Sequence, residues 1–144
     1  FVSGIRKMSY FRAKHSIMQI EHLAIWVKDL EAMRSFYEKY FQAAAGERYH
    51  NPKKNLMSYF LSFEQGCRLE LMHTPEIAAN LNEDQHLGII HFAISVGSKE
   101  KVDSLTEELR NAAYSVIGEP RTTGDGYYES VVLDPEGNRI EVTI

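Results

Sequence analysis

The chain has 144 residues, of which 44% are hydrophobic and 25% are charged. These values fit one soluble domain with a sizeable core and leave no room for a second large domain. No stretch approaches the roughly 20 apolar residues that a membrane span requires. The net charge is −4, and residues 1–17 carry four basic side chains and no acidic one, so the remaining residues carry −8. This acidity argues against a nucleic-acid surface, which needs clustered Lys and Arg, and favours a small-molecule partner.

The single cysteine, Cys67, excludes an internal disulfide and a four-thiolate metal site. Low cysteine use is typical of a reducing compartment, so we expect a cytoplasmic protein. The basic segment 1–17 has the composition of a transit leader, but a disordered or foreign upstream remnant fits better, because the strand pattern begins only at Met18. We therefore expect residues 18–144 to form a single domain.

The sequence contains an internal repeat, which begins with two matching strands. Residues 20–27 (IEHLAIWV) and 89–96 (IIHFAISV) align at a constant offset and are rich in β-branched residues. Alternate side chains of each segment are uniformly apolar, whereas the opposite face carries a histidine and a small alanine. The pattern therefore predicts two equivalent strands, with His22 and His91 at equivalent positions.

The repeat continues through a helix and a hairpin. Each first strand is followed by an N-cap residue, Asp29 or Ser98, and then by apolar residues at helical spacing. Residues 65–71 and 136–142 then share the pattern Gly-x-Arg-apolar-Glu-apolar, in which the glycine suits a hairpin turn. The expected hairpin strands are Met57–Phe63 with Arg68–His73, and Tyr127–Leu133 with Arg139–Ile144.

Each unit thus reads β-α-β-β-β, and a duplication of this size determines the fold. We predict an α+β domain of two such modules, residues 18–74 and 88–144, joined by residues 75–87. The modules are expected to form a curled, mixed sheet around a metal cleft, with the helices outside.

Four residues at equivalent positions of the two modules predict the metal site. His22 and Glu70 in the first module match His91 and Glu141 in the second, with nearly equal spacing. One histidine on a strand is usually structural, but two His–Glu pairs are hard to explain by packing, because a buried carboxylate needs a partner. Two imidazoles and two carboxylates suit one divalent ion, which could be Zn, Ni, Co, Mn or Fe. An octahedral site would keep two positions for water or for adjacent substrate oxygens.

Two motifs resemble those of the vicinal oxygen chelate superfamily, which includes glyoxalases, bleomycin-resistance proteins and extradiol dioxygenases. They are residues 22–31 (HLAIWVKDLE), followed by Ser35-Phe36-Tyr37, and residues 133–141 (LDPEGNRIE). The resemblance covers residues 19–144 and is greatest to lyases of the glyoxalase I type. It implies that the first-strand histidine and last-strand glutamate of each module bind one metal ion.

The same resemblance implies a metal-dependent lyase or isomerase, similar to a lactoylglutathione lyase or an epimerase, that acts on a small oxygen-chelating substrate through an enediolate or enolate. Glu141 would be the first choice for the base that moves the α-proton, and Glu70 the second. Relatives that use glutathione commonly carry an arginine and an asparagine where this chain has Trp26 and Thr74. This difference argues against a glutathione adduct as the substrate.

Other aromatic and basic residues are candidates for substrate binding. Trp26 shares the strand parity of His22, so it would either line the cleft beside an apolar substrate group or belong to the core. The segment 120–128 is expected to form a loop in which Arg121 could pair with a carboxylate or phosphate. Tyr127 and Tyr128 are consecutive residues, and consecutive side chains of a strand point to opposite faces of the sheet. At most one of the two would therefore face the cleft.

Two alternative functions remain open on the sequence alone. One is a binding protein of the bleomycin-resistance type, which would sequester a small molecule in the same cleft. The other is an extradiol dioxygenase, although a fourth ligand at Glu70 would crowd its iron. We also expect a homodimer, because both sheets leave edges that a second chain could cover. The spacing does not decide whether the four ligands meet within one chain or across two.

Overall fold

The computed structural model describes residues 19–77, 89–124 and 126–144. The segment 1–17 and most of the connection 75–87 lie outside these residues. The elements are β1 (His22–Trp26), α1 (Leu30–Phe41), β2 (Ala44–Ala45), β3 (Tyr49–Asn51), β4 (Leu56–Ser62), β5 (Arg68–His73), β6 (Phe92–Ser95), α2 (Lys99–Asn111), β7 (Val116–Thr122), β8 (Tyr128–Leu133) and β9 (Arg139–Thr143). The predicted α+β fold with a β-α-β-β-β repeat is confirmed. Neither helix of the described residues is long and apolar enough to cross a membrane.

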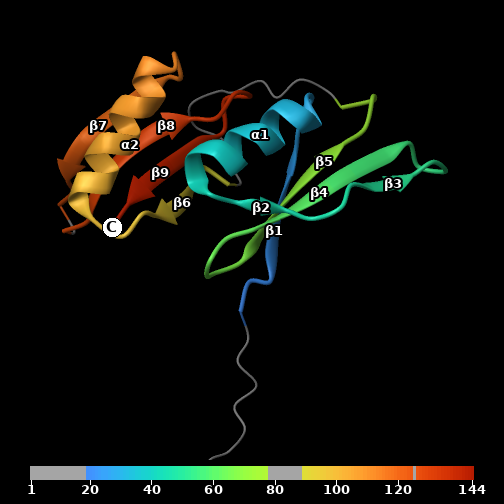
Figure 1. The fold of residues 1–144 in the computed structure, drawn as a ribbon, viewed down its shortest axis with the longest axis horizontal. Helices are drawn as coiled ribbons and strands as arrows, with labels where there is room; N and C mark the ends of the chain where they lie inside the picture. Colours follow the sequence, from blue (N-terminus) through green and yellow to red (C-terminus); the bar gives the residue numbers. More distant parts are fainter. Residues whose placement is uncertain (1–18, 78–88, 125) are drawn as a thin grey trace, which may run out of the picture.

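Each module forms a mixed sheet of its own, and Figure 1 shows the two modules side by side. The strand order is β1-β5-β4-β2 in the first sheet, where β3 also pairs with β4, and β6-β9-β8-β7 in the second. The first and last strands of each module are parallel neighbours, and the other pairings are antiparallel. Their registers are equivalent, because Ala24 lies opposite Glu70 and Ala93 lies opposite Glu141.

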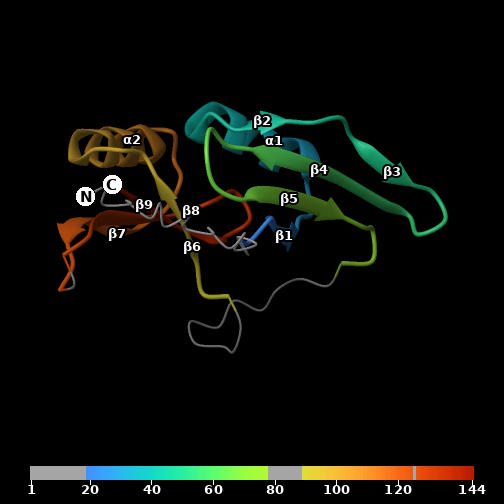
Figure 2. The same ribbon diagram turned by 90° about the horizontal axis from the view of Figure 1, so that it is seen from below.

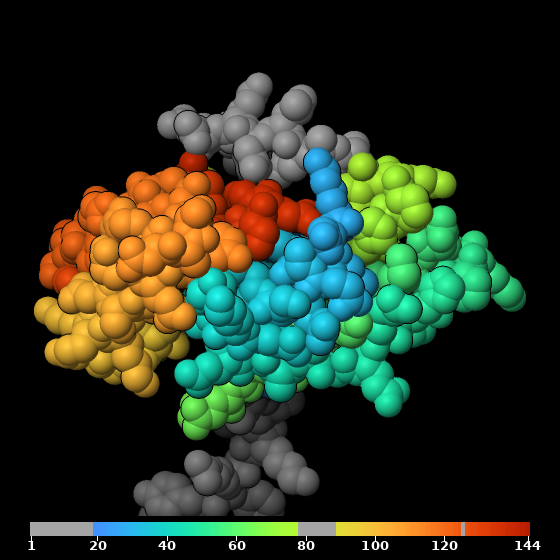
Figure 3. All heavy atoms as spheres, turned by 45° about the horizontal axis from the view of Figure 1, so that its top comes forward, coloured from blue at the N-terminus to red at the C-terminus, as the bar shows by residue number. Residues whose placement is uncertain are grey.

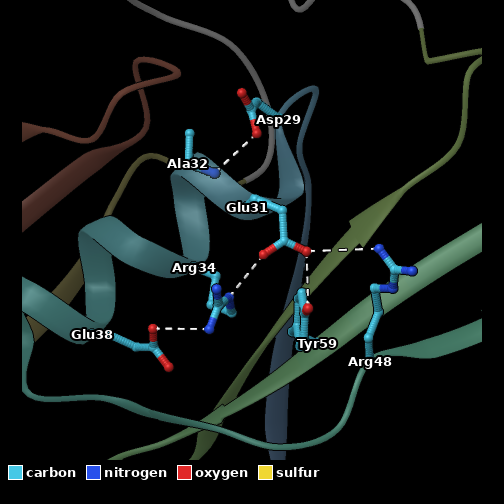
Figure 4. Close-up of polar contacts among 7 residues, drawn as sticks. All are labelled: Asp29, Glu31, Ala32, Arg34, Glu38, Arg48 and Tyr59. Carbon is cyan, nitrogen blue, oxygen red and sulfur yellow. Dashed lines mark hydrogen bonds and ion pairs between the residues drawn. The ribbon is translucent and has the colours of Figure 1, made fainter.

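A polar network attaches α1 to the first sheet (Figure 4). The side chain of Asp29 caps the helix by accepting a hydrogen bond from the Ala32 backbone N–H at 2.9 Å. Glu31, in the first turn, accepts a hydrogen bond from the Tyr59 hydroxyl of β4 at 2.9 Å. The other oxygen of Glu31 accepts from Arg34 at 3.0 Å. The helix therefore begins where the sequence predicts, with its first turn fixed to the sheet below it.

Aromatic side chains of α1 join the two modules. The ring of Phe36 meets that of Tyr114 edge-on, with 4.9 Å between the centroids, and Tyr37 lies 6.4 Å from Phe92. Tyr114 and Phe92 belong to the second module, so α1 packs on both halves of the chain. Such pairs add a modest orientational preference to the burial of their apolar surface. The relative position of the modules thus depends partly on a helix of the first.

Asp134, in the turn between β8 and β9, makes a second connection between the modules. It is only 4% exposed and accepts hydrogen bonds from the Tyr37 hydroxyl, the Asn138 side chain and two backbone N–H groups. Burial raises the pKa of Asp134 above its ordinary value, although these hydrogen bonds oppose the shift. Burial also raises the pKa of Tyr37, so the phenol stays protonated and donates to Asp134.

Glu136 in the same turn reaches the start of α1. Its carboxylate accepts hydrogen bonds from the backbone N–H groups of Lys28 at 2.7 Å and Asp29 at 2.7 Å. These two N–H groups lie at and just before the N-cap of α1, where the positive end of the helix dipole favours an anion. In Figure 3, red residues near the C-terminus meet the blue and cyan residues around this point. The turn of the second module therefore clamps the loop that follows β1.

The bond between Tyr37 and Asp134 should contribute measurably to stability. Tyr37→Phe leaves a buried carboxylate oxygen with one donor fewer, so we expect the free energy of unfolding to fall by about 1.5–3 kcal/mol. Urea denaturation followed by circular dichroism measures this loss. Tyr128→Phe is the matched control, because its hydroxyl donates to Asp103 at the surface. A loss for Tyr37→Phe no larger than that of the control would contradict the assigned role.

Candidate metal-binding site

The predicted ligands lie on the face of each sheet that is opposite to the helices. In β1, His22, Ala24 and Trp26 are exposed, whereas the alternate residues are partly buried against the core. The neighbouring strand β5 alternates in the same way, so Glu70 shares the face of His22. Figure 2 shows both helices on the same side of the strands. The described helices therefore leave the ligand-bearing faces uncovered, and we call each of them an open face.

The first module brings His22 and Glu70 together. The Nε2 atom of His22 lies 3.9 Å from the Oε2 atom of Glu70, and the two side chains are 41% and 14% exposed. Glu70 is held in place by its strand neighbours Leu69 and Leu71, which are buried in the core. One nitrogen and one oxygen thus converge from adjacent parallel strands, at a distance too long for a hydrogen bond.

The second module repeats this arrangement with His91 and Glu141. Their Nε2 and Oε2 atoms lie 3.2 Å apart, and the side chains are 38% and 20% exposed. Two ligand atoms that are each about 2.1 Å from a metal ion, at a right angle, are about 3 Å apart. The second pair matches this spacing, and the first pair would need a wider angle or a small movement. Each module therefore supplies half of the predicted ligand set.

The four predicted ligands do not meet within one chain. In the part of the chain that the structure describes, which includes all four, no three His, Cys, Asp or Glu side chains form a group that could hold a metal ion. Each His–Glu pair thus lies together in its own module, whereas a single chain keeps the two pairs apart. That the four residues bind one metal ion stays a prediction.

Glu21 is a residue of the site that the sequence analysis missed. One of its carboxylate oxygens lies 2.6 Å from the Nδ1 atom of His22, and the other accepts a hydrogen bond from the Nε atom of Arg68 at 2.7 Å. The hydrogen bond with His22 and then that with Arg68 lower the pKa of Glu21. The sequence indicates a role for Glu21 only by its position directly before His22. The repeat gives no such indication, because the equivalent residue of the second module is Ile90.

A groove of about 1000 Å³ lies at the end of β1 that carries Trp26, and none of the four predicted ligands is among the described residues that line it. Trp26 and Thr74 line one side of it, and Pro135 and Asn138 of the β8–β9 turn line the other. Trp26 is 54% exposed, so it does not belong to the core and instead forms part of a surface that a ligand can reach. The groove is therefore lined by residues of both modules.

The predicted loop 120–128 is partly a strand. Arg121 lies in β7, opposite Glu129 of β8, and is exposed. The Tyr128 hydroxyl donates to Asp103 of α2 at 2.7 Å, so this side chain lies on the helix side of the sheet. Tyr127 has the opposite alternation and is 57% exposed. Of the two tyrosines, Tyr127 is thus the one that is not directed towards α2.

Comparison with known sequences gives one family and one curated relative. The family model described as "Glyoxalase/Bleomycin resistance protein/Dioxygenase superfamily" matches residues 19–142. The uncharacterized protein YqjT of Bacillus subtilis (strain 168) is 27% identical over 129 residues, which are 85% of this chain and 96% of that protein. The matched region thus contains both modules.

Comparison with solved structures supports the same fold. A glyoxalase family protein from Enterococcus faecalis has a TM-score of 0.72 and 23% identity, over 88% of this chain and 97% of that chain. The trypanothione-dependent glyoxalase I of Leishmania major has a TM-score of 0.70 and 22% identity, over 88% of this chain and 86% of that chain. At these identities the likeness shows the fold.

Proposed function

Because this chain belongs to the glyoxalase, bleomycin resistance and dioxygenase superfamily, we propose that it is a metal-dependent lyase or isomerase of the glyoxalase type. The observation that carries this proposal is the duplicated pair of ligands. Each module places a histidine nitrogen and a glutamate oxygen within 4 Å of each other on its open face. A binding protein that only sequesters a ligand has no need of four such residues at equivalent positions.

We propose further that the complete site forms between two chains. Each chain supplies two separate pairs, so a two-fold dimer could join the first pair of each chain to the second pair of its partner. Such a dimer would contain two complete sites. Large apolar side chains are exposed near both pairs, which favours a partner chain that buries them. They are Ile20, two residues before His22, and Ile89 and Ile90, directly before His91.

The four side chains fit a divalent ion by their chemistry, since two neutral imidazole nitrogens and two carboxylates are borderline ligands without thiolate softness. A bound ion would supply Lewis-acid polarisation of adjacent substrate oxygens. Glu141 would accept the proton from the carbon next to the polarised carbonyl, and Glu70 is the second candidate. Glu141 is 20% exposed and lies between Ile140 and Val142, which are fully buried, so its backbone is rigidly placed.

Trp26, which shares the open face of β1 with His22, is the basis of our proposal for the substrate class. An indole that is half exposed offers a flat apolar surface, so it favours a substrate with an apolar or aromatic part. Arg121 lies on an exposed strand, where it could pair with an anionic group of the substrate. We therefore propose a small 2-oxo or 2-hydroxy compound with an apolar substituent, in preference to a glutathione adduct.

Metal analysis tests the ligand set directly. We expect purified protein to carry about one divalent ion per chain, since a two-fold dimer has two sites. Glu141→Gln replaces an anionic ligand by a neutral one and should lower the metal content sharply. Elemental analysis by mass spectrometry measures both. Glu129→Gln is the control, because it removes a carboxylate from β8 without removing a proposed ligand. Wild-type protein without metal after loading and desalting would contradict the proposal.

Mixing two inactive variants tests whether the site spans two chains. Glu70→Gln damages the first pair and Glu141→Gln damages the second, so neither homodimer has an intact site. After subunit exchange, a mixed dimer would combine the intact pairs of both chains in one of its two sites. About a quarter of the wild-type metal content should therefore return in an equal mixture. A site within one chain predicts no recovery.

Proton exchange tests the chemistry. We expect the metal-loaded protein to exchange the α-proton of 2-oxoaldehyde thiol adducts or α-substituted thioesters into deuterated water, because enolisation requires removal of that proton. Nuclear magnetic resonance follows the loss of the α-proton signal. Glu141→Gln should slow the exchange at least about 100-fold, because it removes the proposed base together with a proposed metal ligand. Metal-loaded protein that binds such compounds without exchange would favour the sequestration function.

A further inference from the structure

The environment of His22 differs from that of His91, although the two residues are equivalent in the repeat. Beside His22, the carboxylate of Glu21 bridges the Nδ1 atom of the imidazole and the guanidinium of Arg68. The guanidinium lies over the ring of Phe60 at 4.1 Å, and the ring of His22 meets Phe60 edge-on at 5.3 Å. Each of these four groups therefore contacts at least one of the others, and His22 is held from two sides.

The second module has no counterpart for two of these contacts. Ile90 stands where Glu21 would be, and Val131, which lies opposite Glu141, stands where Phe60 lies opposite Glu70. Ile90 is 45% exposed and has no side-chain atom that could accept a hydrogen bond. The two halves of the repeat thus share their ligands but differ in what holds each histidine.

The contact with Glu21 determines which nitrogen of His22 carries the proton. An ionised carboxylate only accepts hydrogen bonds, so the Nδ1 atom at 2.6 Å must be the donor. In a neutral imidazole the other nitrogen, Nε2, then has a free lone pair. That nitrogen is the one on the side of Glu70, at 3.9 Å. The lone pair is therefore available where the proposed metal ion would bind.

We propose that Glu21 is a positioning residue, which fixes the orientation and tautomer of His22 so that Nε2 is ready to bind metal. Arg68 holds the second oxygen of Glu21 and prevents the carboxylate from rotating away. The half-site of the first module is thus organised before metal binds, whereas the neighbour of the His91 imidazole among the described residues is Glu141, at 3.2 Å. This inference rests on the proposed metal function, but its effect on the tautomer is present without metal.

The tautomer can be observed in metal-free protein. Two-bond ¹H–¹⁵N correlation spectra, recorded at a pH where the imidazoles are neutral, distinguish a proton on Nδ1 from one on Nε2. We expect the Nδ1–H pattern for His22 in the wild type and a shift towards the Nε2–H pattern in Glu21→Ala. The signals of His22 are identified by their loss in His22→Gln. An Nε2–H pattern in the wild type, or no change in Glu21→Ala, would overturn the proposal.

Zn²⁺ affinity, measured by competition with a chelator, gives the second readout. Glu21→Ala should bind Zn²⁺ about 10- to 100-fold more weakly, as is usual when the carboxylate behind a metal-binding histidine is lost. Glu47→Ala removes another exposed glutamate of the first module and should retain wild-type affinity. Equal affinities of Glu21→Ala and the wild type would overturn the positioning role. Wild-type protein that takes up none of Zn²⁺, Ni²⁺, Co²⁺, Mn²⁺ and Fe²⁺ would instead refute the metal function, and the spectra would still decide the role of Glu21.

Discussion

The parallel pairing of the first and last strand in each module is the constraint on which the rest of the site depends. It places strands that are distant in the sequence side by side, with Ala24 opposite Glu70 and Ala93 opposite Glu141. Parallel strands cannot be joined by a tight hairpin, so a long connection must lie between them in the sequence. In this chain the connection consists of a helix and antiparallel strands, which gives the β-α-β-β-β unit. A shift of one residue in either register would move a carboxylate to the helix side.

The contacts between the modules determine how the two half-sites are presented. Phe36 and Tyr37 pack α1 against the second module, and the β8–β9 turn returns to the first through Asp134 and Glu136. The turn acts on the loop directly after β1, the strand that begins with His22. The same residues that bury the junction therefore also limit the movement of the first ligand strand. The acidic turn is thus both a structural link between the modules and a wall of the groove beside Trp26.

Most of the fold could be predicted from the sequence because the repeat supplied the same information twice. The N-caps of the two helices, Asp29 and Ser98, could be predicted from the spacing of the apolar residues that follow them. The alternation of side chains along the strands indicated which histidine and glutamate share a face. The predicted unit has one strand between the helix and the hairpin, but the sequence indicated no bounds for it. The first module has two short strands there, β2 and β3, of two and three residues, and segments this short show no periodicity. The strand β7 was partly read as a loop, because Gly118 and Pro120 interrupt its pattern, and both are tolerated at this edge strand with an irregular register.

The site was predicted less completely than the fold, for two physical reasons. Spacing gives the neighbours of a strand within a sheet, but it gives no information on how two sheets are turned relative to each other. The sequence therefore left open whether the pairs meet, and the described residues of one chain keep them apart. The direction of an exposed side chain such as Glu21 depends on a partner from another strand, in this case Arg68. No local pattern distinguishes such a glutamate from one that faces solvent.

A duplicated unit does not need to remain symmetrical once its halves meet as parts of one site. If the first pair of one chain faces the second pair of another, each complete site contains one copy of both kinds of half-site. The two histidines of such a site always come from different modules. Their surroundings therefore do not need to be identical. The half with Glu21, Arg68 and Phe60 can keep its imidazole in a fixed orientation. The half with Ile90 and Val131 lacks the contacts that Glu21 and Phe60 make with the imidazole, and its His91 lies 3.2 Å from Glu141 instead. The closer of the two pairs thus includes Glu141, the first candidate for the base that accepts the proton from substrate.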